Sequence, residues 1–172
     1  KLAKWGRSYI NIDKKYTVLD LGCGGGRNIE YFLTKADKVY GLDHSKTSVK
    51  MASEINKKAI DTGRCQIFVG DVKSLPFEDE SIDIVTAFET IYFWNDIEEC
   101  FKEIYRVLKE GGQFLICNEV SSKERRDVKK ILKIINFEVY KAEDLTKILR
   151  GLGFTCQYYL DSKKQMVVIA KK

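Results

Sequence analysis

The sequence predicts an α/β fold: a seven-stranded, mostly parallel sheet with helices on both faces. Short apolar runs rich in β-branched or aromatic residues alternate with longer segments whose apolar residues have helical spacing. A glycine-rich loop, residues 22–26, follows the first apolar run directly. The last two runs are separated only by "DSKK", which leaves no room for a crossover helix, so they must form an antiparallel hairpin.

Each element can be assigned in chain order. The expected strands are residues 17–21, 38–43, 65–71, 82–88, 112–120, 154–160 and 165–170. The expected helices between the first five strands are residues 27–36, 45–63 and 96–112. Ser45 is a plausible cap for the second helix, and Asn95 or Asp96 for the third, which is expected to end in the glycine pair "GG".

Composition indicates one globular domain spanning residues 1–172. Hydrophobic residues make up 44% and charged residues 32%, which disfavours disorder, and the single proline, Pro76, marks no linker. No apolar stretch approaches the ~20 residues of a membrane span, and no leader is evident. The five cysteines are scattered without a CxxC pair, so we expect no metal site and a reduced, cytoplasmic protein. A net charge of +5 permits nucleic acid as a partner but does not imply it.

The glycine loop departs from the dinucleotide-binding pattern. A G-x-G-x-x-G motif can use Gly22 and Gly24, but its third glycine falls on Arg27. The loop instead has glycine at alternate positions, preceded by Asp20 at the end of the first strand. Such glycines allow close approach to the backbone, while the carboxylate repels a phosphate and attracts an ammonium or hydroxyl group. The loop therefore favours a ligand without a pyrophosphate.

Two more carboxylates end the next two strands. Asp43 has the spacing of an acidic residue that accepts hydrogen bonds from a ribose diol. Asp71, one strand further out, could accept from the exocyclic amine of an adenine. Together with the loop, these positions describe a site for a nucleoside with a cationic tail.

Four motifs in correct order carry a family resemblance. "VLDLGCGGGRN", "VYGLDHS", "GDVKSLPFEDESIDIVTA" and "EIYRVLKEGGQFLI" resemble those of class I S-adenosylmethionine-dependent methyltransferases, and are most similar to small domains related to quinone-biosynthesis methyltransferases. The resemblance runs from about residue 17 to residue 118. It implies a Rossmann-like sheet of order 3-2-1-4-5-7-6 with strand 7 antiparallel, and S-adenosylmethionine as cofactor.

The resemblance also implies roles for individual residues. The three loop glycines approach the cofactor, Asp20 lies near its amino group, Asp43 holds the ribose, and Asp71 with the Val72 backbone reads the adenine. The expected cofactor-binding residues are Asp20, Gly22, Cys23, Gly24, Gly26, Asp43, His44, Asp71, Val72, Phe88 and Glu89. Cys23 is expected to be packing filler, and His44 to border the cofactor.

Aromatic residues indicate an acceptor pocket, although closure of the core explains them equally well. The expected pocket residues are Trp5, Tyr9, Tyr92 and Trp94. In the family, an N-terminal segment, here residues 1–16, often folds over the site as a lid. Residues 119–141 occupy the place of a variable acceptor-side insert and are rich in basic residues. Such a segment fits a solvated helix face, and alternatively an anionic acceptor site or a nucleic-acid contact.

The expected reaction is in-line displacement of a sulfonium methyl group, which requires positioning more than acid or base catalysis. If the acceptor needs deprotonation, the candidate bases are Glu89, Tyr92, Glu119 and His44. A small-molecule acceptor is favoured, because "FETIYF" stands where nucleic-acid amino methyltransferases carry an N-P-P-Y type motif. An RNA acceptor and a noncatalytic binding module stay open as alternatives. A nicotinamide oxidoreductase is disfavoured by the missing glycine.

Overall fold

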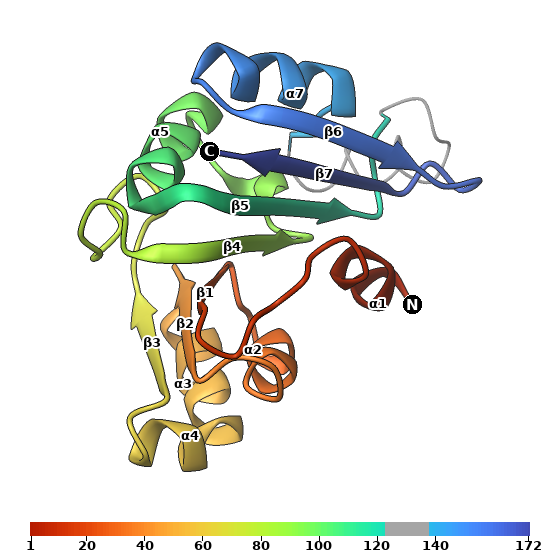
Figure 1. Cartoon of the computed structure of the whole chain (residues 1–172). Helices are drawn as coiled ribbons and strands as arrows, with labels where there is room; N and C mark the ends of the chain where they lie inside the picture. Colours follow the sequence, from red (N-terminus) through yellow and green to blue (C-terminus); the bar gives the residue numbers. More distant parts are fainter. Residues whose placement is uncertain (123–137) are drawn as a thin grey trace.

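The computed structural model describes residues 1–122 and 138–172 (Figure 1). Residues 123–137, which include most of the expected acceptor-side insert and its basic cluster, lie outside the described residues. The strands are β1 (Thr17–Leu21), β2 (Lys38–Asp43), β3 (Cys65–Val69), β4 (Ile82–Phe88), β5 (Leu108–Asn118), β6 (Thr155–Leu160) and β7 (Met166–Lys171). The helices are α1 (Leu2–Arg7), α2 (Arg27–Phe32), α3 (Lys46–Ile55), α4 (Lys57–Asp61), η1 (Ile91–Phe93), α5 (Ile97–Val107) and α7 (Ala142–Gly151).

The strands form one seven-stranded sheet of order β3-β2-β1-β4-β5-β7-β6, which confirms the predicted order. The pairs from β3 through β5 are parallel, and β7 is antiparallel to both β5 and β6. Because the first five strands share one direction, their carboxyl ends meet at one edge of the sheet. The loops after β1 to β4 therefore converge there.

Side-chain alternation along the strands divides the core into two layers. In β1, Leu19 and Leu21 face the layer that includes residues of α5 and α7, whereas Val18 faces the layer of α2 and α3. Helix α1 packs over the second layer, against β5. Helices therefore cover both faces of the sheet, as predicted.

All three expected helices differ from the prediction at their ends. The first, expected to reach Ala36, already ends at Phe32. The helix that begins at Ser45 is confirmed at its cap, where Ser45 accepts from the Ser48 N–H at 3.2 Å, but it is interrupted at Asn56. The third helix ends at Val107 and not at the glycine pair. Gly111 and Gly112 lie inside β5, where the register with β4 shifts and Gly111 has a φ of 78°. Gly111 supplies the left-handed backbone of a bulge.

All five cysteines are free and buried. Burial raises the pKa of the Cys23 thiol above its ordinary value, so the thiol in the glycine loop stays protonated and unreactive. Among the helices in the described ranges, 1–122 and 138–172, none has the length and apolar character needed to span a bilayer.

Candidate functional site

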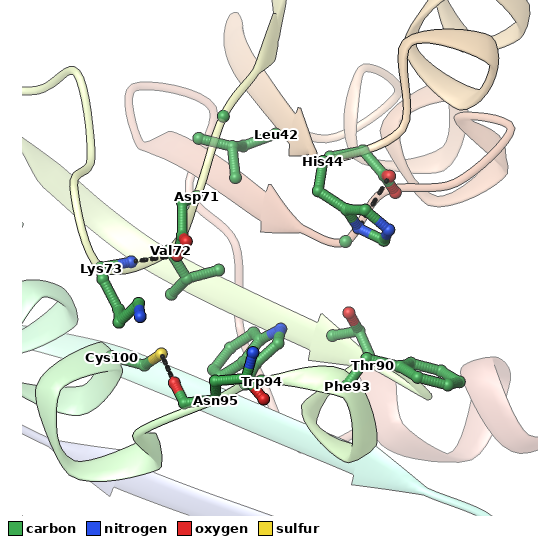
Figure 2. Close-up of a pocket in the computed structure, with 13 residues that line it drawn as sticks. Leu42, His44, Asp71, Val72, Lys73, Thr90, Phe93, Trp94, Asn95 and Cys100 are labelled. Atoms are coloured by element: carbon green, nitrogen blue, oxygen red, sulfur yellow. Dashed lines mark hydrogen bonds and ion pairs between the residues drawn. The ribbon is translucent and has the colours of Figure 1, made fainter. Parts of the chain in front are cut away.

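A pocket of about 280 Å³ lies at the carboxyl edge of the sheet (Figure 2). Its walls come from the loops after the first four strands and from the start of α5. The lining residues are Gly22, Leu42, Asp43, His44, Gly70, Asp71, Val72, Lys73, Thr90, Phe93, Trp94, Asn95 and Cys100. Sequence reasoning anticipated Gly22, Asp43, His44, Asp71, Val72 and Trp94 among them.

The glycine loop after β1 depends on left-handed backbone. Gly22, Gly24 and Gly26 have φ values of 64°, 52° and 80°. A Cβ on Gly22 would collide with the Thr90 side chain, whereas a Cβ on Gly24 would have no heavy atom within 4 Å. Gly22 is thus needed to bring the loop against the end of β4, while the backbone at Gly24 faces open space.

Asp43, the last residue of β2, is buried and joins the loop to the next helix. Its Oδ2 accepts from the Gly24 N–H at 2.9 Å, and its Oδ1 accepts from the Ser45 N–H at 2.9 Å. These two bonds fix the carboxylate at the pocket wall. Each oxygen keeps an unused lone pair, since a carboxylate has about four acceptor positions. His44 is largely exposed, with its Nδ1 3.6 Å from Asp43 Oδ1.

Asp71 and Val72 lie in the loop after β3. Asp71 is exposed and accepts from the Lys73 N–H at 2.9 Å, and Val72 is buried against the core. Figure 2 shows both facing the aromatic side chain of Trp94 across the pocket. Trp94 is 9% exposed and packs edge-on against Phe101 at 6.5 Å between ring centroids. An acidic and an apolar wall thus oppose an indole ring.

A partly exposed ion pair on α5, between Arg106 and Glu103, supports this loop. Arg106 donates to the Phe77 carbonyl at 2.8 Å and to the Leu75 carbonyl at 3.2 Å, and bonds both oxygens of Glu103. Glu103 in turn accepts from the Leu75 N–H at 2.9 Å. The Arg106 guanidinium lowers the pKa of Glu103, so the pair stays charged. Both residues were absent from the predicted site, although the motif that contains Arg106 was recognised.

Asp20 lies beneath the loop and does not line the pocket. Its Oδ1 accepts from the Thr86 hydroxyl of the neighbouring β4 at 2.6 Å, and the residue is only 1% exposed. Burial raises the pKa of Asp20 from its ordinary 3.8 to about 7, against the lowering effects of Thr86 and of Arg7. Because Asp20 alternates with Leu19 and Leu21, it faces the layer covered by α1 and α2.

Three of the four candidate bases meet at the ends of β4 and β5. Glu89, with a left-handed φ of 58°, accepts from the Tyr92 hydroxyl at 3.3 Å and from the backbone N–H of Glu119. The Tyr92 hydroxyl also accepts from the Val120 N–H at 2.9 Å. Burial raises the pKa of the Glu89 carboxyl and of the Tyr92 hydroxyl. The cluster therefore braces the two strand ends, and His44 lies apart from it.

The other predicted residues lie on the α1 side. Cys23 is buried, and Phe88 packs into the same layer, 6.5 Å from Phe32 between ring centroids. Trp5 and Tyr9 contact each other edge-on at 5.7 Å, and Tyr9 stacks on Tyr159 at 4.4 Å. Trp5, Tyr9 and Tyr92 are not among the residues that line the pocket. The structure thus groups Asp43, Asp71 and Val72 around one pocket together with Trp94, and places the other three aromatic residues expected to bind an acceptor outside that pocket.

The donor set fits a nucleoside without phosphates. Two carboxylates, Asp43 and Asp71, reach the pocket, and its lysine, Lys73, is held by Asp96 at 3.4 Å. Arg27, at the position of the missing glycine, is largely exposed and pairs with Glu30. The lining residues that the sequence did not predict are Leu42, Gly70, Lys73, Thr90, Phe93, Asn95 and Cys100.

The chain also resembles known proteins. Residues 19–116 match the family described as a methyltransferase domain. The uncharacterized methyltransferase YcgJ of Bacillus subtilis is 32% identical over 111 residues, covering 64% of this chain and 43% of YcgJ. The sterol 24-C-methyltransferase of Clavispora lusitaniae is 30% identical over 162 residues, covering 88% of this chain and 43% of that protein. The chain thus spans less than half the length of these two relatives.

Solved structures share the fold. A methyltransferase in complex with the Trm112 methyltransferase activator of Haloferax volcanii superimposes with a TM-score of 0.88 at 22% identity, covering 99% of this chain and 88% of that one. The sheet order, the glycine loop and the family match over residues 19–116 agree with one another. The chain therefore belongs to the methyltransferase domain family, within the class I S-adenosylmethionine-dependent methyltransferases.

Proposed function

We propose that this chain binds S-adenosylmethionine in the pocket at the carboxyl edge and directs its methyl group to a small-molecule acceptor. The observation that carries the proposal is the Asp43 carboxylate, fixed at the pocket wall by the Gly24 and Ser45 N–H groups. Its remaining lone pairs are suited to accept from two adjacent ribose hydroxyls. Asp71 and the Val72 backbone would hold the adenine, and Asp20 would attract the amino group.

S-adenosylmethionine supplies a methyl group on a positively charged sulfur, so the protein needs to orient the acceptor and exclude water. Phe88 and Glu89 would flank the methionine portion. Tyr92 and Trp94, with Trp5 and Tyr9, would contribute to acceptor binding, residues 1–16 acting as a lid. If the acceptor needs a base, Glu89 is the favoured candidate, because it lies at the end of β4 and burial raises the pKa of its carboxyl above the ordinary value.

A small-molecule acceptor is supported by the name of one relative, the sterol 24-C-methyltransferase of Clavispora lusitaniae, which aligns with 88% of this chain. The direct test is a screen of metabolites, including sterols and other lipid alcohols, that follows the release of S-adenosylhomocysteine. We expect turnover with at least one small molecule. Turnover with RNA alone would overturn the proposed acceptor class and leave the cofactor assignment intact.

The ribose contact is tested with Asp43→Asn. We expect S-adenosylhomocysteine to bind at least tenfold more weakly, because a charged hydrogen bond contributes about 1.5–3 kcal/mol. Isothermal titration calorimetry measures the affinity. Asp61→Asn, which removes an exposed carboxylate on α4, is the matched control and should bind as the wild type does.

Since Asp43 also holds the loop, a second comparison separates the two effects. An analogue of S-adenosylhomocysteine that lacks one ribose hydroxyl should bind the wild type more weakly than S-adenosylhomocysteine does. Asp43→Asn should bind the two ligands with nearly the same affinity. Equal losses in both proteins would remove Asp43 from the ribose.

A further inference from the structure

A second cavity, the lysine groove, has a volume of about 360 Å³ and lies where β5 ends. The described residues that line it include Ser121, Ser122, Lys141, Glu143, Leu160 and Lys164. They come from the segment after β5, from the start of α7 and from the hairpin of β6 and β7, whose turn extends past the carboxyl end of β5 in Figure 1. None of the described residues that line it also lines the pocket with Asp43 and Asp71. The lysine groove is therefore a separate cavity on the same edge of the sheet.

Two lysines give the lysine groove a positive charge. Lys141 directly precedes α7, Lys164 lies in the turn between β6 and β7, and both residues are exposed. Within residues 1–122 and 138–172, neither lysine forms an ion pair, whereas Lys73 in the other pocket is paired with Asp96. Two ammonium groups without a carboxylate partner on the walls of one cavity favour an anionic ligand.

Glu143 also lines the lysine groove, but another residue engages its carboxylate. Its Oε1 accepts from the Tyr158 hydroxyl at 3.0 Å. Tyr158 lies on β6 two residues before Leu160, on the same face of the strand and farther from the turn that carries Lys164. Lys141 and Glu143 are two positions apart at the start of α7, a spacing at which side chains do not face each other. The carboxylate therefore leaves both ammonium groups available to a ligand.

The turn that carries Lys164 is held in place by hydrogen bonds. Asp161 Oδ1 accepts from the Lys163 and Gln165 N–H groups, both at 2.8 Å, as aspartate does in turns of the Asx type. The buried Ser121 hydroxyl donates to the Lys164 carbonyl at 2.6 Å. These bonds join the turn to the segment after β5, so the backbone of this wall is in position before a ligand binds.

The segment after β5 also connects the lysine groove with the cofactor pocket. Val120, directly before Ser121, donates its N–H to the Tyr92 hydroxyl at 2.9 Å. The same hydroxyl donates at 3.3 Å to Glu89, the favoured base. Trp94, two residues after Tyr92, lines the cofactor pocket. Tyr92 and Val120 thus join the wall of the groove to the wall of the pocket.

We propose that the lysine groove binds a phosphate or carboxylate group carried by the acceptor, with Lys141 and Lys164 as its charge partners. The inference rests on the proposed function, in which the methyl donor occupies the pocket lined by Asp43 and Asp71. An ammonium is a compact charge with three N–H donors, so it suits either anion, whereas a neutral lipid alcohol offers it no charge. The acceptor class therefore narrows from small molecules in general to anionic ones.

The first test is a titration with inorganic phosphate and, separately, with acetate at constant ionic strength, followed by the amide chemical shifts of the protein. We expect saturable shifts at the residues that line the lysine groove with at least one of the two anions. The two titrations are read separately, so they show which anion the groove takes.

The double variant Lys141→Gln with Lys164→Gln should bind that anion at least fivefold more weakly. The matched control is Lys147→Gln with Lys163→Gln, which removes the same two charges from α7 and from the same turn, at positions that do not line the groove. The control should bind the anion as the wild type does. All four lysines are exposed, so these changes leave the core intact.

The second test offers candidate acceptors in charged and neutral pairs, a lipid alcohol with its phosphate ester and a carboxylic acid with its methyl ester. We expect the charged member to release S-adenosylhomocysteine at least tenfold faster at low concentration. For an acceptor that is turned over, the Lys141 and Lys164 double variant should raise KM at least tenfold and change kcat less than twofold. The reason is that these lysines bind the acceptor without touching the reacting atoms.

The outcomes separate this inference from the proposed function. A wild type that binds neither anion, or a double variant that binds them as the control does, overturns the groove as an anion site. Equal turnover of the charged and neutral members overturns its role in acceptor binding. Both results leave the cofactor assignment intact. A wild type that fails to bind S-adenosylhomocysteine overturns the proposed function, and the anion titration still reports on the groove.

Discussion

Asp20 couples the stability of the protein to pH, because burial raises its pKa to about 7 from an ordinary 3.8. Below pH 4 the carboxyl is protonated in both folded and unfolded chains. Between pH 4 and 7 the unfolded chain ionises while the folded chain holds its proton, so the free energy of unfolding falls as pH rises. Above pH 7 both states are ionised and the dependence ends.

Asp20→Asn should abolish this dependence. The amide oxygen can still accept from Thr86, whose hydroxyl bonds Asp20 at 2.6 Å. Between pH 4 and 7, we expect the free energy of unfolding of the wild type to fall by up to about 4 kcal/mol relative to that of Asp20→Asn. This follows from about 1.36 kcal/mol per unit of pKa difference between the folded and unfolded chains. Urea denaturation of both proteins across this range measures the difference. Parallel curves for the two proteins would contradict the raised pKa.

At the scale of elements, α5 holds the loop that carries Asp71 and Val72. Arg106→Lys should lower the free energy of unfolding by about 1–3 kcal/mol, since a lysine cannot reproduce the bonds to Glu103, Phe77 and Leu75. Arg106→Lys should also weaken the binding of S-adenosylhomocysteine, because the loop that carries Asp71 and Val72 loses its support. Chemical denaturation and calorimetry measure the two effects.

Lys102→Gln is the matched control on the same helix. Lys102 pairs with Glu99 at 2.7 Å on the exposed face of α5, where ion pairs contribute little. The control should change stability by less than about 0.5 kcal/mol. If Arg106→Lys behaved like this control, the loop would be held by its own packing and not by α5.

For the whole molecule, cofactor binding should appear as thermal stabilisation. At 100 times its dissociation constant, S-adenosylhomocysteine should add about 2.7 kcal/mol to the free energy of unfolding. For a chain of 172 residues this raises Tm by roughly 5–10 °C. Differential scanning fluorimetry with S-adenosylhomocysteine and with NAD makes the comparison. A shift with NAD alone would identify a dinucleotide site instead.

The sheet was predictable because its strands are local and strongly patterned. β1, β2 and β4 have the expected bounds, and the short "DSKK" connection requires the antiparallel end of the sheet. The start of β5 was missed because a glycine pair after a helix serves equally as a helix stop or as a bulge. Only the pairing with β4, 26 residues earlier at Ile82 and Leu108, decides between them.

The site, like the sheet, has parts that the sequence predicts and parts that it does not. Asp43 and Asp71 could be assigned because their chemistry follows directly from their place at the ends of strands. The contact of Tyr92 with Val120 and the support of Leu75 by Glu103 join segments more than 20 residues apart, and no local pattern marks them. The closer relation to quinone-biosynthesis enzymes stays a prediction.

The pocket at the carboxyl edge is built from a contiguous part of the chain, because every lining residue lies between Gly22 and Cys100. None of the described residues beyond Cys100 contributes to it. The hairpin of β6 and β7 and the turns near β5 can therefore vary without changing a residue that lines this pocket. The domain is therefore modular: the segment from Gly22 to Cys100 supplies the whole lining of this pocket, and the described segments after it can be exchanged, by evolution or by design, without replacing a lining residue.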